Sequence, residues 1–269
     1  MSILNIAHRG GAAMHPENTM AAFDHAIALG CDGAELDVHL SADGVVVVHH
    51  DDRLNLDYAR DKDGDWLSAP TPLIRELTFA QLQSYDLGHI RPGSDYAAGH
   101  PAQKPARHAR IPSLAEVAAA ARAAKFLLMV ELKMFEGAGQ ADVLRLADAT
   151  LDVMKDDLAR TIFVGFDWRC LLRIRKTAPD AKVWFTTDKL EGDVAPVIAG
   201  IAAAGAQGWF PHFANLTTES VAQARALGLK CGGWTVNDAE DMKRIARLTP
   251  DAICSDRPKL LKAVLDAIT

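Results

Sequence analysis

Short apolar segments alternate along this chain with longer segments in which apolar residues recur every three or four positions. Buried strands and amphipathic helices produce these two patterns, and their alternation predicts a parallel α/β architecture. The candidate strands are 3–8, 33–40, 45–50, 126–133, 161–166, 182–187, 207–212 and 230–236. These are eight, which is the strand number of a closed (β/α)8 barrel of the TIM type. Another apolar stretch, Ala252–Cys254, precedes the last helical pattern. Whether it belongs to a strand is left open.

Helical patterns occupy most of the connections between these strands. Asn18 is the predicted N-cap of a helix that runs to about Leu29, and Gly30 is its predicted end. Ser113-Leu114-Ala115-Glu116 has the form of a capping box before an alanine-rich helix. Pro258 fits the first turn of the last helix, where its missing N–H group costs nothing. The remaining helical patterns are near 140–157, 168–178, 193–204, 217–227 and 238–248.

One break in the alternation lies between Asp37 and His50. This link between the second and third candidate strands is too short for a crossover helix, and Asp43-Gly44 is a turn signal. A turn at 42–45 predicts an antiparallel hairpin with Asp37 opposite His50. A distorted parallel connection would also bring both residues to one rim, so that alternative stays open.

A second break is the segment 53–112, after the third candidate strand. It is polar, holds six prolines and contains one helix signal, Thr78-x-x-Gln81. Such a length is unusual for a βα loop. We therefore expect one barrel domain over residues 1–269, with 53–112 as an insertion or lid at the functional rim. The alternative is a surface excursion without a part in function.

Composition and charge limit the classes of protein to which this chain can belong. The chain has 269 residues, 49% of them hydrophobic and 24% charged, with a net charge of −6. This balance is typical of a globular protein and gives no support for nucleic-acid binding. No apolar run is long enough to span a membrane and no secretory leader is recognisable, so we expect a cytoplasmic protein. The oligomeric state cannot be predicted. The four cysteines lack metal-binding spacing and are expected to be buried thiols.

Charged residues stand where the candidate strands end. Side chains two apart in a strand share one face, and barrel enzymes carry their functional groups at the C-terminal ends of the strands. Four consecutive strands should therefore deliver charged groups to one rim. In chain order these groups are His8 and Arg9, Glu35 and Asp37, His50 and Asp51, and Glu131 and Lys133.

Three of these side chains, Glu35, Asp37 and Glu131, are carboxylates that would repel one another at close range. Each would be driven towards protonation unless a cation compensated. Oxygen ligands of this kind suit Mg²⁺, Ca²⁺ or Mn²⁺ rather than zinc. Arg9 and Lys133 would then add positive charge around the ion. The result is a locally positive pocket in an acidic protein, which suits a phosphate group.

Phosphoryl transfer also needs a base for the nucleophile and an acid for the leaving group. His8 and His50 are the candidates, because a histidine titrates near neutral pH. Each observation has a plainer alternative: a strand-end histidine is often structural, and Lys133 could simply neutralise Glu131. The pair Glu35 and Asp37 could likewise be held in salt bridges. The joint placement at strand ends favours the phosphate site.

The same residues resemble the motifs of the glycerophosphodiester phosphodiesterase family, in order and over nearly the whole chain. Each segment is weak by itself, but the ordered set is specific. The matching segments are His8-Arg9-Gly10-Gly11 with Pro16-Glu17-Asn18-Thr19, Glu35-Leu36-Asp37-Val38, Asp43-Gly44, Val47-Val48-His49-His50-Asp51, Val130-Glu131-Leu132-Lys133, Trp234-Thr235-Val236-Asn237 and Ser255-Asp256-Arg257-Pro258.

The resemblance implies a barrel with an insertion after the third strand and a distinct role for each matched residue. His8 and His50 would be the acid and base, and one divalent cation would be held by Glu35, Asp37 and Glu131. Arg9 and Lys133 would bind the phosphate. Trp234 would form the wall of the pocket beside the glycerol or head-group side of the substrate.

Two departures from the family pattern concern the substrate. Gly165 stands before Phe166-Asp167 where the family often has serine, and Leu54-Asn55-Leu56-Asp57 replaces a common arginine–threonine run. The predicted reaction is metal-dependent hydrolysis of a small glycerophosphodiester, such as glycerophosphocholine or glycerophosphoethanolamine, to glycerol 3-phosphate and an alcohol. One alternative is a lysophospholipase D-like or other phosphodiesterase. The other is a non-catalytic phosphate-binding barrel.

Overall fold

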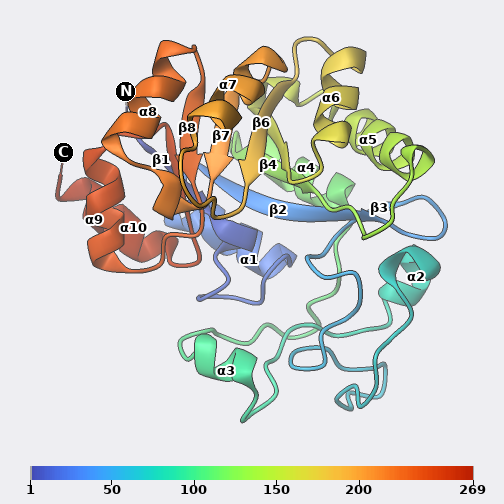
Figure 1. The fold of residues 1–269 in the computed structure, drawn as a ribbon. Coiled ribbons are helices and arrows are strands. Elements are labelled where there is room, and N and C mark those ends of the chain that lie inside the picture. The colour runs from blue at the N-terminus through green and yellow to red at the C-terminus, as the bar shows by residue number, and fades with distance from the viewer. Residues whose placement is uncertain (1, 269) are drawn as a thin grey trace.

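The computed structural model describes residues 2–268, and its centre is a closed barrel of parallel strands (Figure 1). The strands follow one another around the barrel in chain order, and β1 pairs with both β2 and β9, which closes the ring. The barrel strands are β1 (Leu4–Ala7), β2 (Gly33–Leu40), β4 (Leu127–Leu132), β5 (Thr161–Gly165), β6 (Lys182–Thr187), β7 (Gly208–Pro211), β8 (Lys230–Gly233) and β9 (Ala252–Ser255). The predicted TIM-type barrel is confirmed.

Helices surround this barrel, as the alternating pattern predicts (Figure 1). They are α1 (Met20–Leu29), α4 (Leu114–Ala124), α5 (Gln140–Met154), α6 (Trp168–Thr177), α7 (Ala195–Ala203), α8 (Thr218–Ala226), α9 (Ala239–Arg247) and α10 (Pro258–Asp266). Short 3₁₀ turns occur at His8–Gly10, Leu158–Arg160 and Phe213–Asn215. None of the helices between residues 2 and 268 combines the length and apolar character that crossing a membrane requires.

Two apolar layers hold the barrel together. The larger one lies between the strands and the helices, and the smaller one fills the barrel interior with side chains such as Ile6, Met129, Trp184 and Phe210. Gly208 makes room for the Trp184 ring, because a Cβ atom at residue 208 would lie 2.6 Å from that ring. Alternate residues of each strand therefore face inward, and the inward series continues past the strand ends into the functional rim.

The candidate strand 45–50, one of the eight predicted for the barrel, is not part of it. Only Val46–Val48 forms a strand, β3, and it pairs antiparallel with β2 outside the closed ring. The eighth barrel strand is instead β9, the apolar stretch before the last helix. Its four residues are too few to show a strand pattern, but both neighbours pair with it.

The β2–β3 hairpin is confirmed, but its register differs by one residue from the prediction. Val38 pairs with Val48, and the His49 N–H donates to the Asp37 carbonyl at 3.0 Å, so His49 rather than His50 lies opposite Asp37. The cause is a loop of three residues, 42–44, closed by the Ser41 N–H group bonding to the carbonyl of residue 45 at 2.9 Å. An odd loop length shifts the pairing by one position.

The segment 53–112 follows this hairpin and packs at one end of the barrel (Figure 1). It contains a 3₁₀ turn at Ile74–Glu76 and the short helices α2 (Phe79–Leu82) and α3 (Asp95–Gly99). A separate apolar cluster stabilises it, built from Leu54, Tyr58, Ile74, Leu77, Leu82, Leu87 and Ile111 together with Val47 of β3. The insertion therefore has a small core of its own; its role as a lid stays a prediction.

Helix capping follows the sequence signals with one exception. The Ser113 hydroxyl accepts from the Glu116 N–H at 3.3 Å, and Gly30 ends α1 at φ 75°. The N-cap of α1 is Thr19, whose hydroxyl accepts from the Ala22 N–H at 3.4 Å. The prediction of Asn18 as the cap was wrong, because its side chain points into the barrel rim and donates to Asp37 at 2.8 Å.

Candidate functional site

The three predicted carboxylates lie together at the C-terminal rim. Asp37 of β2 and Glu131 of β4 are register partners, and Glu35 precedes Asp37 by two residues on the same face. All three are buried, and ligand oxygens of the three lie within 4.8 Å of one another. Parallel pairing of β2 with β4 therefore produces the cluster that strand periodicity predicts.

The electrostatics of this trio leave one carboxyl without compensation. Burial raises the pKa of Glu35 well above its ordinary value, and the charges of Asp37 and Glu131 raise it further. Burial alone would raise the pKa of Asp37 too, but the charges of Arg9 and Lys133 hold it well below its usual range. The Glu35 Oε1 atom is buried and has no hydrogen-bond partner between residues 2 and 268. Three converging oxygen donors with one unpartnered oxygen fit a hard divalent cation.

Two cationic side chains border the trio. Lys133 Nζ lies 2.9 Å from Glu131 Oε1 and 3.5 Å from Asp37 Oδ1. Arg9 Nε lies 3.5 Å from Asp37 Oδ2, and the Arg9 backbone N–H donates to Glu35 Oε2 at 3.1 Å. Each cation has about one fifth of its side chain exposed. Both therefore offset the buried carboxylates and remain open to a ligand.

The backbone turns sharply at Arg9, directly after β1. Arg9 has φ 50° and ψ 33°, and Gly10 and Gly11 also have positive φ. A side chain at residue 10 would not fit, because its Cβ would lie 2.7 Å from the Ala22 Cβ atom. The glycines that follow His8-Arg9 thus allow the sharp turn from β1 towards α1.

His8 is held by a carboxylate that directly follows the neighbouring strand, β9. Its Nδ1 atom lies 2.6 Å from Asp256 Oδ1, and Asp256 accepts a second bond at 2.6 Å from the Asn237 amide. Burial would raise the pKa of Asp256, but the charge and hydrogen bond of His8 lower it to about 2. The Nε2 atom of His8 faces Glu35 at 3.8 Å. An Nδ1–H bond to a carboxylate leaves Nε2 as the reactive nitrogen.

His50 has the same kind of partner. Its Nδ1 atom lies 2.7 Å from Asp51 Oδ1, and Asn55 of the insertion donates to Asp51 at 3.4 Å. Burial would raise the pKa of Asp37, and the charge of His50 adds to those of Arg9 and Lys133 in lowering it. His49 is buried and contacts the Arg53 carbonyl at 3.2 Å, on the other side of the chain as predicted.

The opposite side of the rim is aromatic. Trp234 follows β8, and its indole N–H donates to the Phe210 carbonyl at 3.1 Å. Its ring meets Phe166 edge-on at 5.4 Å and His212 edge-on at 5.7 Å. Phe166 is 44% exposed and 6.0 Å from Lys133 Nζ. An open hollow lined by Glu131, Lys133, Phe135, Phe166, Trp168 and Leu172 connects this aromatic side to the acidic trio.

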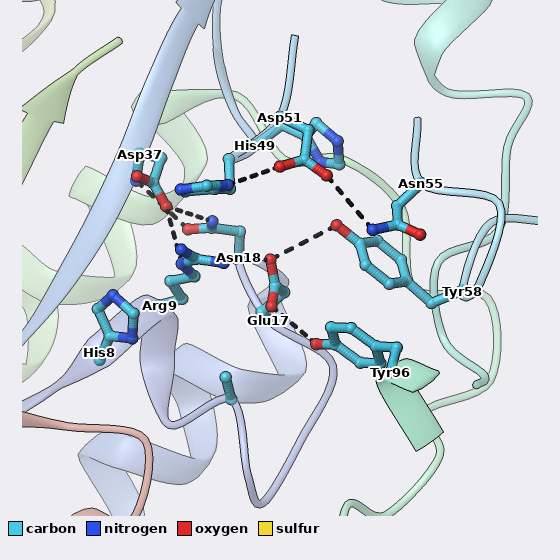
Figure 2. Close-up of polar contacts among 12 residues, drawn as sticks. His8, Arg9, Glu17, Asn18, Asp37, His49, Asp51, Asn55, Tyr58 and Tyr96 are labelled. Carbon is cyan, nitrogen blue, oxygen red and sulfur yellow. Dashed lines mark hydrogen bonds and ion pairs between the residues drawn. The ribbon is translucent and has the colours of Figure 1, made fainter. Parts of the chain in front are cut away.

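Several polar partners in the site have no chemical role in the sequence interpretation, although Glu17 and Asp256 lie in matched segments. Asp256 lies two residues after Cys254, which faces the barrel interior. If β9 is recognised as a strand, its periodicity therefore places Asp256 at the functional rim. Glu17 accepts from Arg9 at 2.9 Å, and Tyr96 of the insertion donates to Glu17 at 2.7 Å (Figure 2). No local pattern indicates that tyrosine, because it is 79 residues away in the chain.

Fold and site together define the class: a (β/α)8 barrel enzyme with an acidic centre, two carboxylate-paired histidines and two cations at its C-terminal rim. The model of the glycerophosphoryl diester phosphodiesterase family matches residues 8–260. The chain belongs to this family, and it is a phosphodiesterase.

Individual relatives agree over nearly their full length. A glycerophosphodiester phosphodiesterase of Caldanaerobacter subterraneus is 30% identical over 265 residues, which are 97% of each chain. A Silicibacter pomeroyi structure, provisionally named a glycerophosphoryl diester phosphodiesterase, is 31% identical with TM-score 0.94, and the match covers 99% of this chain and 94% of that one. An Oleispira antarctica phosphodiesterase in complex with the product sn-glycerol-3-phosphate is 25% identical, with TM-score 0.78 and coverage of 99% and 97%.

Proposed function

We propose that this enzyme hydrolyses small glycerophosphodiesters to glycerol 3-phosphate and an alcohol, with His8 and His50 as the acid–base pair. The observation that carries the proposal is the buried carboxylate trio, with its unpartnered Glu35 oxygen, beside two histidines that each have a carboxylate on Nδ1. The relative from Oleispira antarctica, solved with glycerol 3-phosphate, supports the choice of substrate.

Glu35, Asp37 and Glu131 would hold one divalent cation, Mg²⁺ or Ca²⁺, with Mn²⁺ as a further candidate. Bound there, the ion would supply charge stabilisation for the phosphoryl oxygens. It would also relieve the repulsion that raises the pKa of Glu35. The acidic residues alone give a net negative centre that disfavours a phosphate, so the reaction should depend on the ion.

The two histidines would divide the proton transfers. Each Nδ1 atom is paired with a carboxylate, so the Nε2 atom of each ring would accept or donate the proton. One imidazole deprotonates the nucleophile, which is water or the glycerol 2-hydroxyl, and the other protonates the leaving alkoxide. Asp256 and Asp51 fix the tautomers and stabilise the imidazolium forms, as carboxylate partners do in other histidine sites.

The remaining residues would bind the substrate. Arg9 and Lys133 would donate to phosphoryl oxygens and stabilise the charge that develops on them. Trp234 would wall the glycerol or head-group side, because its ring lies on the aromatic half of the rim. The partly exposed Phe166 extends that wall.

The test is release of glycerol 3-phosphate from glycerophosphocholine by protein treated with EDTA, then given Mg²⁺, Ca²⁺ or Mn²⁺. We expect release to disappear with EDTA and to return with at least one ion, while circular dichroism shows an unchanged fold. Undiminished release in EDTA would contradict the cation site. No release with any ion would contradict the substrate, and inactivity on every diester tested would favour a phosphate-binding barrel.

A second candidate substrate is a lysophospholipid. The observation in its favour is the apolar surface beside Glu131 and Lys133, where Phe166 and Leu172 are 44% and 45% exposed. An acyl chain could lie on such a surface. Rates on glycerophosphocholine and lysophosphatidylcholine, compared at equal concentrations below micelle formation, decide between the two substrates.

A further inference from the structure

Glu17 is a buried carboxylate beside the acidic trio, and the proposed chemistry gives it no part. It lies between β1 and α1 and is 7% exposed. Its Oε1 atom accepts from Arg9 Nη1 at 2.9 Å, and its Oε2 atom accepts from the Tyr96 hydroxyl at 2.7 Å (Figure 2). The Tyr58 hydroxyl lies 3.5 Å from Oε1 as a third, weaker donor. A buried carboxylate with donors on both oxygens is held in one place.

The contacts of Arg9 show what this carboxylate does. Nη1 bonds to Glu17, and Nε lies 3.5 Å from Asp37 on the other side. Between residues 2 and 268, no hydrogen bond of Arg9 uses Nη2. The guanidinium is therefore held between two carboxylates with one nitrogen left for a ligand. Without Glu17, the remaining attraction would draw the guanidinium into the acidic trio.

The insertion reaches this contact through Tyr96 on α3. The Tyr96 ring stacks on His100 at 4.0 Å and meets the Tyr58 ring at 4.8 Å, so three insertion side chains brace one another. Burial raises the pKa of the Tyr96 hydroxyl well above its ordinary value, and the charge of Glu17 raises it further. The hydroxyl thus stays protonated and donates to Glu17 throughout the neutral range.

We propose that Glu17 is a positioning residue, which holds the Arg9 guanidinium where it meets a phosphoryl oxygen, and that the insertion supports the reaction through the Tyr96–Glu17 hydrogen bond. This inference rests on the proposed function, because that function makes Arg9 a phosphate ligand. The insertion would then support the active site directly, through Tyr96 and Glu17, whether or not it also covers the substrate.

The test is a double-mutant cycle in steady-state kinetics with glycerophosphocholine and the activating ion. The variants are Glu17→Gln, Tyr96→Phe and Arg9→Asn, since asparagine tolerates the left-handed backbone at residue 9. We expect Glu17→Gln to lower kcat/KM about tenfold and Tyr96→Phe about threefold, mainly through kcat, because small displacements of a positioned group slow the chemical step. In the Arg9→Asn background, neither change should lower kcat/KM further by more than about twofold.

Tyr85→Phe is the matched control, because it removes another insertion hydroxyl that has no hydrogen bond within residues 2–268. Its kcat/KM should equal that of the wild type. Equal losses with and without Arg9 would overturn the proposal, since Glu17 would then act through the fold in general. Unchanged kinetics in Glu17→Gln would overturn it as well.

A second readout needs no turnover and separates this inference from the proposed function. Urea unfolding of the wild type, Glu17→Gln, Arg9→Asn and the double variant should show coupling of at least about threefold in the unfolding equilibrium constant. A wild type without activity on any diester would contradict the proposed function alone, whereas absence of coupling in the unfolding cycle would contradict the Glu17–Arg9 contact. An active wild type with coupled unfolding but additive kinetics would contradict the positioning role.

Discussion

The two halves of the barrel rim differ in kind. Charged residues that pair with one another lie near or just beyond the C-terminal ends of β9, β1, β2 and β4. Phe166, His212 and Trp234 follow β5, β7 and β8. The carboxylate trio at the centre of the charged half is buried, whereas the aromatic half is partly open. Under the proposed function, phosphoryl chemistry and recognition of the organic groups would occupy separate arcs of one ring.

Burial explains why we propose a bound ion for the charged half alone. Carboxylates out of water are costly unless charges or hydrogen bonds compensate them. Arg9 and Lys133 compensate Asp37, but the pKa of Glu35 remains raised by burial and by its acidic neighbours. The aromatic half carries no such cost, because its polar edges have backbone partners, as in the bond from Trp234 to the Phe210 carbonyl.

The largest expected effect comes from removing either imidazole of the charged half. His8→Ala and His50→Ala should each lower kcat by about 10²–10⁴, which is the usual contribution of a general acid or base. Steady-state release of glycerol 3-phosphate measures it. His108→Asn, at an exposed histidine of the insertion, is the control and should be fully active. Near-wild-type turnover by His8→Ala or by His50→Ala would remove that residue from the chemistry.

A substitution in the aromatic half should have a smaller effect, on KM rather than on kcat. Trp234→Ala should raise KM for glycerophosphocholine about tenfold and leave kcat within about threefold, because a wall binds ground and transition states alike. Leu227→Ala, at an exposed leucine after α8, is the control for loss of an apolar side chain. A fall in kcat as large as that of the histidine variants would contradict the separation of binding in the aromatic half from chemistry in the charged half.

The smallest expected effect is on stability, at the junction of β1 and β9. The pKa of Asp256 is lowered from 3.8 to about 2, so its ionised form stabilises the fold above pH 4 and this stabilisation is lost as the pH falls towards 2. The shift corresponds to about 2 kcal/mol. Asp256→Asn should therefore lose less stability than the wild type between pH 5 and pH 2.5, as measured by urea unfolding.

The control for this prediction is Asp24→Asn, which changes an exposed carboxylate on α1. It should keep the acid dependence of the wild type. An Asp256→Asn variant with the same acid dependence would show that the His8–Asp256 pair contributes nothing to folding.

The charged half of the rim was predictable because strand geometry is local. Side chains two apart share a face, so Glu35 with Asp37 and Glu131 with Lys133 could be placed from spacing alone. Their convergence then needed only the parallel order of β2 and β4, which the alternating pattern also predicts. The barrel fold follows from the same periodicity.

What could not be predicted depends on short elements and on distant contacts. The hairpin register shifted by one because loop length, which the turn signal did not determine, sets the pairing of β3 with β2. The role of Asp256 as the partner of His8 was not predicted, because β9 has only four residues and its strand character comes from its neighbours. The Tyr96–Glu17 bond joins the insertion to the barrel across 79 residues, beyond any local pattern.

The most direct test of the account is a crystal structure with Mn²⁺ and glycerol 3-phosphate, in which the anomalous signal of manganese locates the ion. The account predicts the ion among Glu35, Asp37 and Glu131, the phosphate against Arg9 and Lys133, and the glycerol towards Trp234. An ion bound away from these three carboxylates, or a glycerol group lying on the charged half with the aromatic half unused, would contradict it.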